Sequence, residues 1–110
     1  MAAREPNTRS SLDGFVTSDL TAALPGATVG IDGLTGGLHR QTATNSSGYY
    51  LLDDVPPGGY SVWAEVRGYG CIIYPHVAVF RGQRTRQDFH FVRGKRLPKG
   101  CQPVEKITDP

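Results

Sequence analysis

Short runs in which every second residue is apolar recur along this chain. Residues 27–32 (ATVGID) and 60–66 (YSVWAEV) show the pattern most clearly. A period of two places successive side chains on opposite faces of an extended strand, so each run predicts a half-buried β-strand. The same reasoning predicts seven strands, at residues 12–17, 27–32, 39–44, 49–52, 60–66, 72–80 and 84–92.

Turn-forming residues separate these runs. Segments 45–48 (NSSG) and 55–59 (VPPGG) are typical tight turns, and Pro75 indicates an edge strand or a bulge. Because no run has the period of a helix, the pattern predicts an all-β, seven-stranded Greek-key β-sandwich. Its predicted core consists of Phe15, Val29, Ile31, Leu51, Tyr60, Val62, Ala64, Val77, Val79, Phe89 and Phe91.

Length and charge define the regions around this sandwich. The 110 residues suffice for one domain, which we place at residues 12–92, between a flexible leader (1–11) and a basic tail (93–110). Residues 81–99 contain seven Arg or Lys side chains and one acidic residue, whereas residues 1–80 contain four basic and seven acidic residues. Such a basic region is either a solvated surface or a contact for an acidic partner, a lipid head group or a polyanion.

The two cysteines, Cys71 and Cys101, form no metal-binding or redox motif. They are either two unrelated thiols or one disulfide that ties the tail to the loop near Cys71. No apolar stretch is long enough to span a bilayer, and residues 1–11 contain no secretory signal. The chain is therefore either cytoplasmic or a mature form whose signal peptide has been removed.

Several motifs follow one another in a distinctive order: residues 14–17 (GFVT), 24–29 (LPGATV), 42–50 (TATNSSGYY), 52–60 (LDDVPPGGY) and 68–69 (GY). In this order and at this spacing the chain resembles the carboxypeptidase regulatory-like domain, a transthyretin-like (prealbumin-like) β-sandwich. The resemblance implies an accessory module without an active site of its own. It also implies export, to the extracellular space, the cell surface or the periplasm, and so favours a removed signal peptide.

Candidate chemistry is sparse. A transthyretin-like hydrolase of 5-hydroxyisourate uses histidines and an arginine in a groove between subunits, whereas His39, His76 and His90 are scattered along this sequence and the tail lacks the tyrosine-rich signature of those enzymes. The adjacent carboxylates of Asp53 and Asp54 diverge on an extended chain, and no nucleophile elbow occurs. The sequence therefore predicts no enzyme, no cofactor and no metal site.

Contact candidates come from two strands. Trp63 falls on the polar side of its strand, where it is either an exposed contact residue or a side chain covered by loops or the tail. Arg84, Arg86 and His90 share the face of the last strand opposite Phe89 and Phe91, where they either bind a partner or block unwanted strand pairing.

These candidates favour a non-catalytic module that contacts or spaces proteins within a larger assembly, with no nucleic acid as partner. One alternative is a carbohydrate-binding module, suggested by the aromatic residues Trp63, Tyr49, Tyr50, Tyr69 and Tyr74. The other, less favoured, is the hydrolase of 5-hydroxyisourate.

Overall fold

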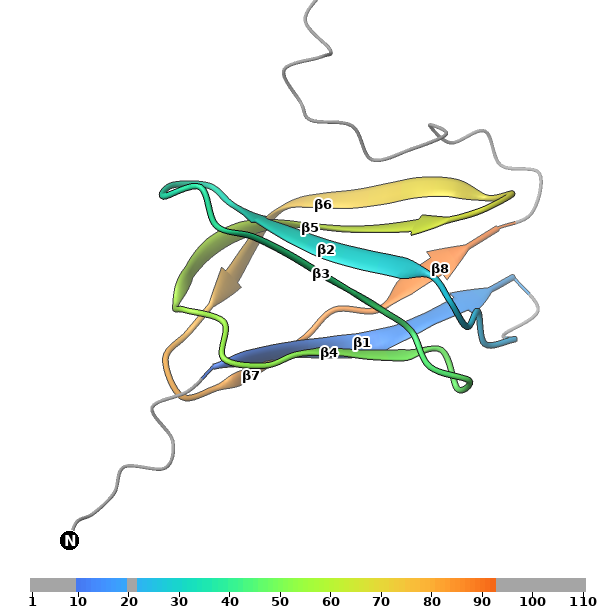
Figure 1. Cartoon of the computed structure of the whole chain (residues 1–110), viewed down its shortest axis with the longest axis horizontal. Helices are drawn as coiled ribbons and strands as arrows, with labels where there is room; N and C mark the ends of the chain where they lie inside the picture. Colours follow the sequence, from blue (N-terminus) through green and yellow to red (C-terminus); the bar gives the residue numbers. More distant parts are fainter. Residues whose placement is uncertain (1–9, 20–21, 93–110) are drawn as a thin grey trace, which may run out of the picture.

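The computed structural model describes residues 10–19 and 22–92, and within these ranges all regular structure is β-strand. The predicted leader and tail lie almost wholly outside them. Eight strands follow in order (Figure 1): β1 (Ser11–Ser18), β2 (Thr28–Gly33), β3 (His39–Ala43), β4 (Tyr49–Leu52), β5 (Gly58–Val66), β6 (Gly70–Val79), β7 (Arg84–Arg86) and β8 (Phe89–Phe91).

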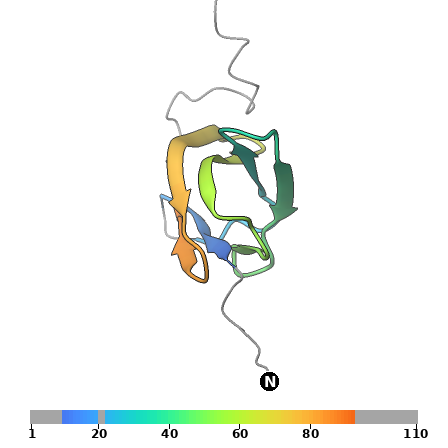
Figure 2. The ribbon, with the colours of Figure 1, turned by 90° about the vertical axis from the view of Figure 1, so that its left-hand side faces the viewer.

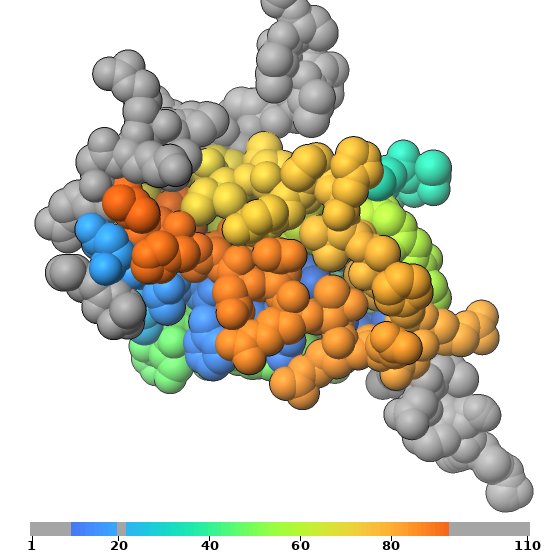
Figure 3. Space-filling view, turned by 180° about the vertical axis from the view of Figure 1, so that it is seen from behind, coloured from blue at the N-terminus to red at the C-terminus, as the bar shows by residue number. Residues whose placement is uncertain are grey.

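The strands form two sheets of four that pack face to face (Figures 1 and 2). One sheet has the order β3-β2-β5-β6 and is antiparallel throughout. In the other, β1 lies in the middle, antiparallel to β4 and parallel to both β7 and β8. Figure 3 shows residues 84–92 (orange) at the rim of this sheet, between β6 (yellow) and β1 (blue). The predicted all-β sandwich is confirmed.

The single strand predicted at residues 84–92 is wrong, since it is divided into β7 and β8. Between them, the amide of Gln87 still donates to the carbonyl of Asp13 (2.8 Å), but the amide of Phe15 donates to the side chain of Asp88 (2.9 Å). A side-chain carboxylate thus replaces a main-chain carbonyl in the ladder. The chain also passes very close to Gly14, where an added Cβ would lie 2.2 Å from the carbonyl oxygen of Gln87. These contacts explain eight strands rather than seven.

The core lies between the sheets and confirms most of the predicted set. Val29, Ile31, Tyr60, Val62, Ala64, Val79, Phe89 and Phe91 are buried, and Val77 packs against them. The prediction is wrong for Phe15 and Leu51, because in β1 and β4 the other set of alternate residues faces the core. In β1, Leu12 and Val16 face the core, and in β4 it is Tyr50 and Leu52 that do so. Phe15 and Leu51 therefore project from the outer surface.

The structure confirms the irregularity predicted at Pro75, an edge strand or a bulge. Polar β3 forms one edge of its sheet and β6 the other. In β6, Pro75 and His76 face a single residue of β5, since the pairing passes from Val62–Tyr74 to Tyr60–Val77. This β-bulge accommodates a proline that could not donate to the ladder.

Candidate functional site: the outer face of the β1 sheet

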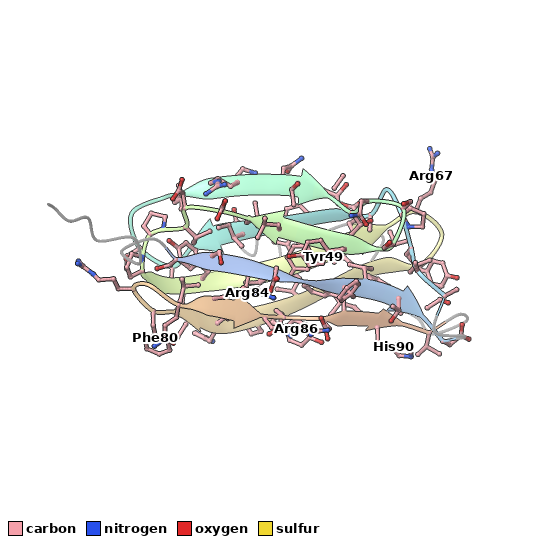
Figure 4. The ribbon with its side chains drawn as sticks, turned by 90° about the horizontal axis from the view of Figure 1, so that it is seen from below. Tyr49, Arg67, Phe80, Arg84, Arg86 and His90 are labelled. Atoms are coloured by element: carbon pink, nitrogen blue, oxygen red, sulfur yellow. The ribbon has the colours of Figure 1, made fainter. Side chains whose placement is uncertain are left out.

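Aromatic and charged side chains gather on the outer surface of the sheet centred on β1. The register places Asp13 between Leu51 and Arg86, Phe15 beside Tyr49, and Thr17 beside His90. We call this surface the β1 face and define it by Asp13, Phe15, Thr17, Tyr49, Leu51, Arg84, Arg86, Asp88 and His90. Figure 4 looks onto it and shows Tyr49 of β4, Arg84 and Arg86 of β7, and His90 of β8, strands that all pair with β1. The prediction that Arg84, Arg86 and His90 share one face is confirmed.

Asp13 is the buried centre of the β1 face. Although it projects outward from the sheet, its side chain is only 2% exposed, because its neighbours cover it. Its Oδ2 atom accepts a hydrogen bond from the hydroxyl of Tyr49 (2.7 Å) and lies 3.0 Å from Nε of Arg84. Its Oδ1 atom has no hydrogen-bond partner among the described residues. The hydrogen bond to Asp13, together with burial, raises the pKa of the Tyr49 phenol, because it stabilises the neutral hydroxyl.

A second arrangement holds Arg86. Its guanidinium carbon lies 5.4 Å from the centre of the Phe15 ring, a cation–π contact, and Phe15 in turn packs against Tyr49 with ring centres 5.2 Å apart. Nε of Arg86 lies 3.1 Å from Oδ1 of Asp88, the same oxygen that accepts from the amide of Phe15. This hydrogen bond raises the pKa of Arg86. A carboxylate therefore orients each of the two arginines, and an aromatic ring also orients Arg86.

The electrostatics of the β1 face differ from those of the basic strand that the sequence suggests. Two arginines are matched by two aspartates, so their formal charges cancel. The exposure is unequal, however: the side chains of Arg84 and Arg86 are 69% and 60% exposed, and that of Asp13 is buried. Each arginine approaches its aspartate through Nε, and within residues 10–19 and 22–92 no hydrogen bond involves their terminal Nη atoms. The outward side of the face is therefore rich in hydrogen-bond donors.

His90, the middle residue of β8, completes the row. Its Nδ1 atom lies 3.3 Å from Oγ1 of Thr17, across the parallel β1–β8 pair, and the side chain is exposed. His39 belongs to β3 and His76 to β6, so the three histidines lie on three separate strands. In the described part of the chain no three His, Cys, Asp or Glu side chains form a group able to hold a metal ion.

Trp63 lies away from the β1 face, on the outer surface of the other sheet. Its indole covers Gly30 of the neighbouring strand, where an added Cβ would lie 2.2 Å from the ring. The indole Nε1 donates a hydrogen bond to Oδ2 of Asp32 (3.0 Å). The other oxygen of Asp32, Oδ1, is hydrogen-bonded to Nδ1 of His39 (2.5 Å). Since Trp63 is only 8% exposed, the structure favours the covered side chain over the exposed contact residue. The signal in the sequence was Gly30, the one outward position of β2 that leaves room for a ring.

Cys71 is buried at the start of β6, opposite Glu65. Its suggested partner Cys101 lies outside the described residues, and the disulfide stays a prediction. In the described residues no helix has the length and hydropathy of a membrane span.

Sequence reasoning missed Asp13 as a member of the site, assigned Phe15 to the core, and named Tyr49 only as a candidate for carbohydrate binding. The only signal was an acid at position 13 and arginines at positions 84 and 86, and the parallel pairing of β1 with β7 that joins them is not visible in the sequence.

The motif order and the fold agree with a family match. The model of the carboxypeptidase regulatory-like domain matches residues 11–92. The chain belongs to this family. No curated protein matches its sequence.

Solved structures share the fold at low sequence identity. A type II cohesin–X–dockerin complex from Acetivibrio cellulolyticus is 24% identical, with a TM-score of 0.60 over 74% of this chain and 56% of that one. A putative carbohydrate binding protein from Bacteroides uniformis is 14% identical (TM-score 0.61), over 74% of this chain and 40% of that one. The 5-hydroxyisourate hydrolase of Klebsiella pneumoniae is 18% identical (TM-score 0.53), over 78% and 93%. The sandwich is thus transthyretin-like, and this chain spans about half the length of the first two proteins.

Proposed function

We propose that this carboxypeptidase regulatory-like domain is a non-catalytic module that contacts another protein through its β1 face. In this proposal it is exported and acts as a subunit or spacer of an extracellular, envelope or surface assembly. The observation that carries the proposal is the pair of exposed arginines, Arg84 and Arg86, each held in place from below by its own carboxylate.

Preorganisation gives these arginines their value in binding. A free arginine side chain loses rotamer entropy when it is immobilised in an interface, at a cost of about 0.5–1.5 kcal/mol. Asp13 and Asp88 have already restricted Arg84 and Arg86 before any partner arrives. Arginine and aromatic residues are also enriched at the energetic centres of protein interfaces, and Phe15 and Tyr49 lie directly beside them.

The comparisons support a contact role by analogy. The Acetivibrio cellulolyticus structure is a complex between cohesin and X–dockerin partners. The family resemblance likewise implies an accessory module.

The carbohydrate-binding alternative receives less support from the side chains. Of the aromatic residues that suggested it, Tyr50 is buried, Trp63 is covered, and Tyr69 and Tyr74 pack against core phenylalanines. Only Tyr49 lies on the β1 face, where its ring packs against Phe15 rather than standing free as a platform for a sugar. The hydrolase alternative has no cluster of histidines in the described residues.

Affinity capture from an extract of the cells that produce the protein tests the proposal. The wild-type chain should retain a specific protein, and a variant carrying Arg84→Ala and Arg86→Ala should lose most of it. Arg67→Ala is the matched control, because Arg67 is an exposed arginine at the end of the sandwich remote from these two (Figure 4). Equal capture by the double variant and by the wild type would overturn the proposal.

A further inference from the structure

We infer that the partner of the β1 face presents an extended acidic segment, whose carboxylates at alternate positions bind the outward edges of Arg84 and Arg86. This inference rests on the proposed function and adds the chemistry of the partner. The inference follows from the hydrogen-bond donors of the β1 face that have no acceptor, and from the spacing of Arg84 and Arg86 along β7.

Donors outnumber acceptors on the outward side of the β1 face. The Nη atoms of both arginines make no hydrogen bond in the described part of the chain, whereas three of the four carboxylate oxygens beneath them are engaged or buried and only Oδ2 of the half-exposed Asp88 is not. Oδ2 of Asp13 already accepts from Tyr49 and lies under Arg84, and Oδ1 of Asp88 accepts from the amide of Phe15 and from Arg86. A complementary surface must therefore supply acceptors. Carboxylates match the planar guanidinium fork best, because they accept two parallel N–H bonds.

The spacing of the two arginines fits an extended peptide. Arg84 and Arg86 occupy alternate positions of β7 and so project from the same side of the sheet, about 7 Å apart along the strand. Alternate side chains of an extended segment have the same separation. A peptide with acidic residues at every second position can therefore place one carboxylate against each guanidinium while its backbone follows β7 and β8.

The surroundings favour a peptide over a dense polyanion. Asp88 is half exposed beside Arg86, and Asp13 lies beneath Arg84, so the described charges of the face sum to zero. A nucleic acid or an anionic membrane depends on many cations at once, whereas this face offers two arginines, which suffice for two carboxylates of a peptide. Exposed Leu51 and the half-buried rings of Phe15 and Tyr49 offer apolar contacts that the side chains of a peptide can use.

Fluorescence anisotropy with two labelled dodecapeptides tests the inference, one alternating Glu with Thr and the other alternating Gln with Thr. At low salt the Glu peptide should bind the full chain at least about tenfold more tightly than the Gln peptide, and its binding should weaken as salt is added. Arg86→Gln should reduce the affinity about tenfold, and Arg67→Gln should leave it unchanged. Arg84→Lys provides a second variant that keeps the charge over Asp13 but removes the fork, and it too should weaken binding.

Two outcomes overturn the inference: equal affinity for the two peptides, or equal loss with Arg67→Gln and Arg86→Gln. These outcomes leave the proposed function standing if the native partner still requires Arg84 and Arg86 in the capture experiment. Conversely, a native partner that ignores the β1 face would contradict the proposed function even where the Glu peptide binds.

Discussion

The exposed guanidinium of Arg84 lies 3.0 Å from the carboxylate of Asp13, a side chain that is 98% covered on the outside of a sheet. The pair fixes an outward-facing cation and neutralises a buried anion at the same time. It is also the link between the stability of this sandwich and its proposed contact surface, because one ion pair serves both.

Removal of Arg84 should therefore affect stability more than removal of another surface arginine. Arg84→Ala leaves the Asp13 carboxylate buried without its ion-pair partner, and we expect a loss of about 1–2 kcal/mol, less than for a fully buried pair because water reaches Arg84. Urea unfolding measures the change. Arg67→Ala should stay within about 0.5 kcal/mol of the wild type. Equal stability of the two variants would mean that Arg84 does not hold Asp13 in solution.

Asp88 should matter to the backbone as well as to Arg86. Asp88→Ala removes the acceptor of the Phe15 amide, so the hydrogen exchange of that amide should accelerate and the free energy of unfolding should fall by about 1–2 kcal/mol. Asp53→Ala is a suitable control, because the described contact of Asp53 is through its main-chain carbonyl. An unchanged exchange rate at Phe15 would show that another group satisfies this amide.

Gly30 should tolerate no side chain. Gly30→Ala would place a methyl group where the indole of Trp63 lies, so the ring must move and lose its hydrogen bond to Asp32. We expect a loss of about 1–3 kcal/mol, with a red-shifted tryptophan emission and stronger quenching by acrylamide. Gly59→Ala meets only the flexible end of Leu34, at 3.1 Å, and should leave the emission unchanged. An unshifted emission in Gly30→Ala would contradict the covered position of Trp63.

Alkaline pH should destabilise the fold through its tyrosines. The pKa of Tyr49 is raised above its ordinary value of 10.0 mainly by its hydrogen bond to Asp13, and that of Tyr50 mainly by burial. A group whose folded pKa is raised stabilises the fold fully below its unfolded pKa and loses that contribution as pH rises toward the folded value. The free energy of unfolding should thus begin to fall near pH 10. Tyr49→Phe and Tyr50→Phe should each reduce the slope, and a slope that neither variant changes would refute this origin.

The sequence predicted the fold class and most of the core residues. Where apolar and polar residues alternate regularly, as in β2 and β5, the pattern shows which face of the strand is buried. It failed in β1 and β4 for a physical reason. Each of these strands has large apolar residues in both phases, such as Leu12 and Phe15, so alternation alone cannot decide which phase faces the core.

The candidate site was predictable only in part. The sequence predicted that Arg84, Arg86 and His90 share a face, because Phe89 and Phe91 at the alternate positions are expected to be buried. It did not predict their counterparts on β1, because they come together through a parallel pairing between the two ends of the domain. Only a tertiary structure reveals that pairing, and with it the neutralisation of the arginines by Asp13 and Asp88.

Site-specific photo-cross-linking tests the central claim, that the β1 face makes the protein contact, most directly. A benzophenone side chain is placed at Leu51 on the β1 face and, separately, at Ile73 on the outer surface of the other sheet, two apolar positions of similar exposure (43% and 39%). In an extract of the producing cells, the probe at Leu51 should form a cross-link to a distinct protein and the probe at Ile73 should not. A cross-link from Ile73 with none from Leu51 would contradict the claim.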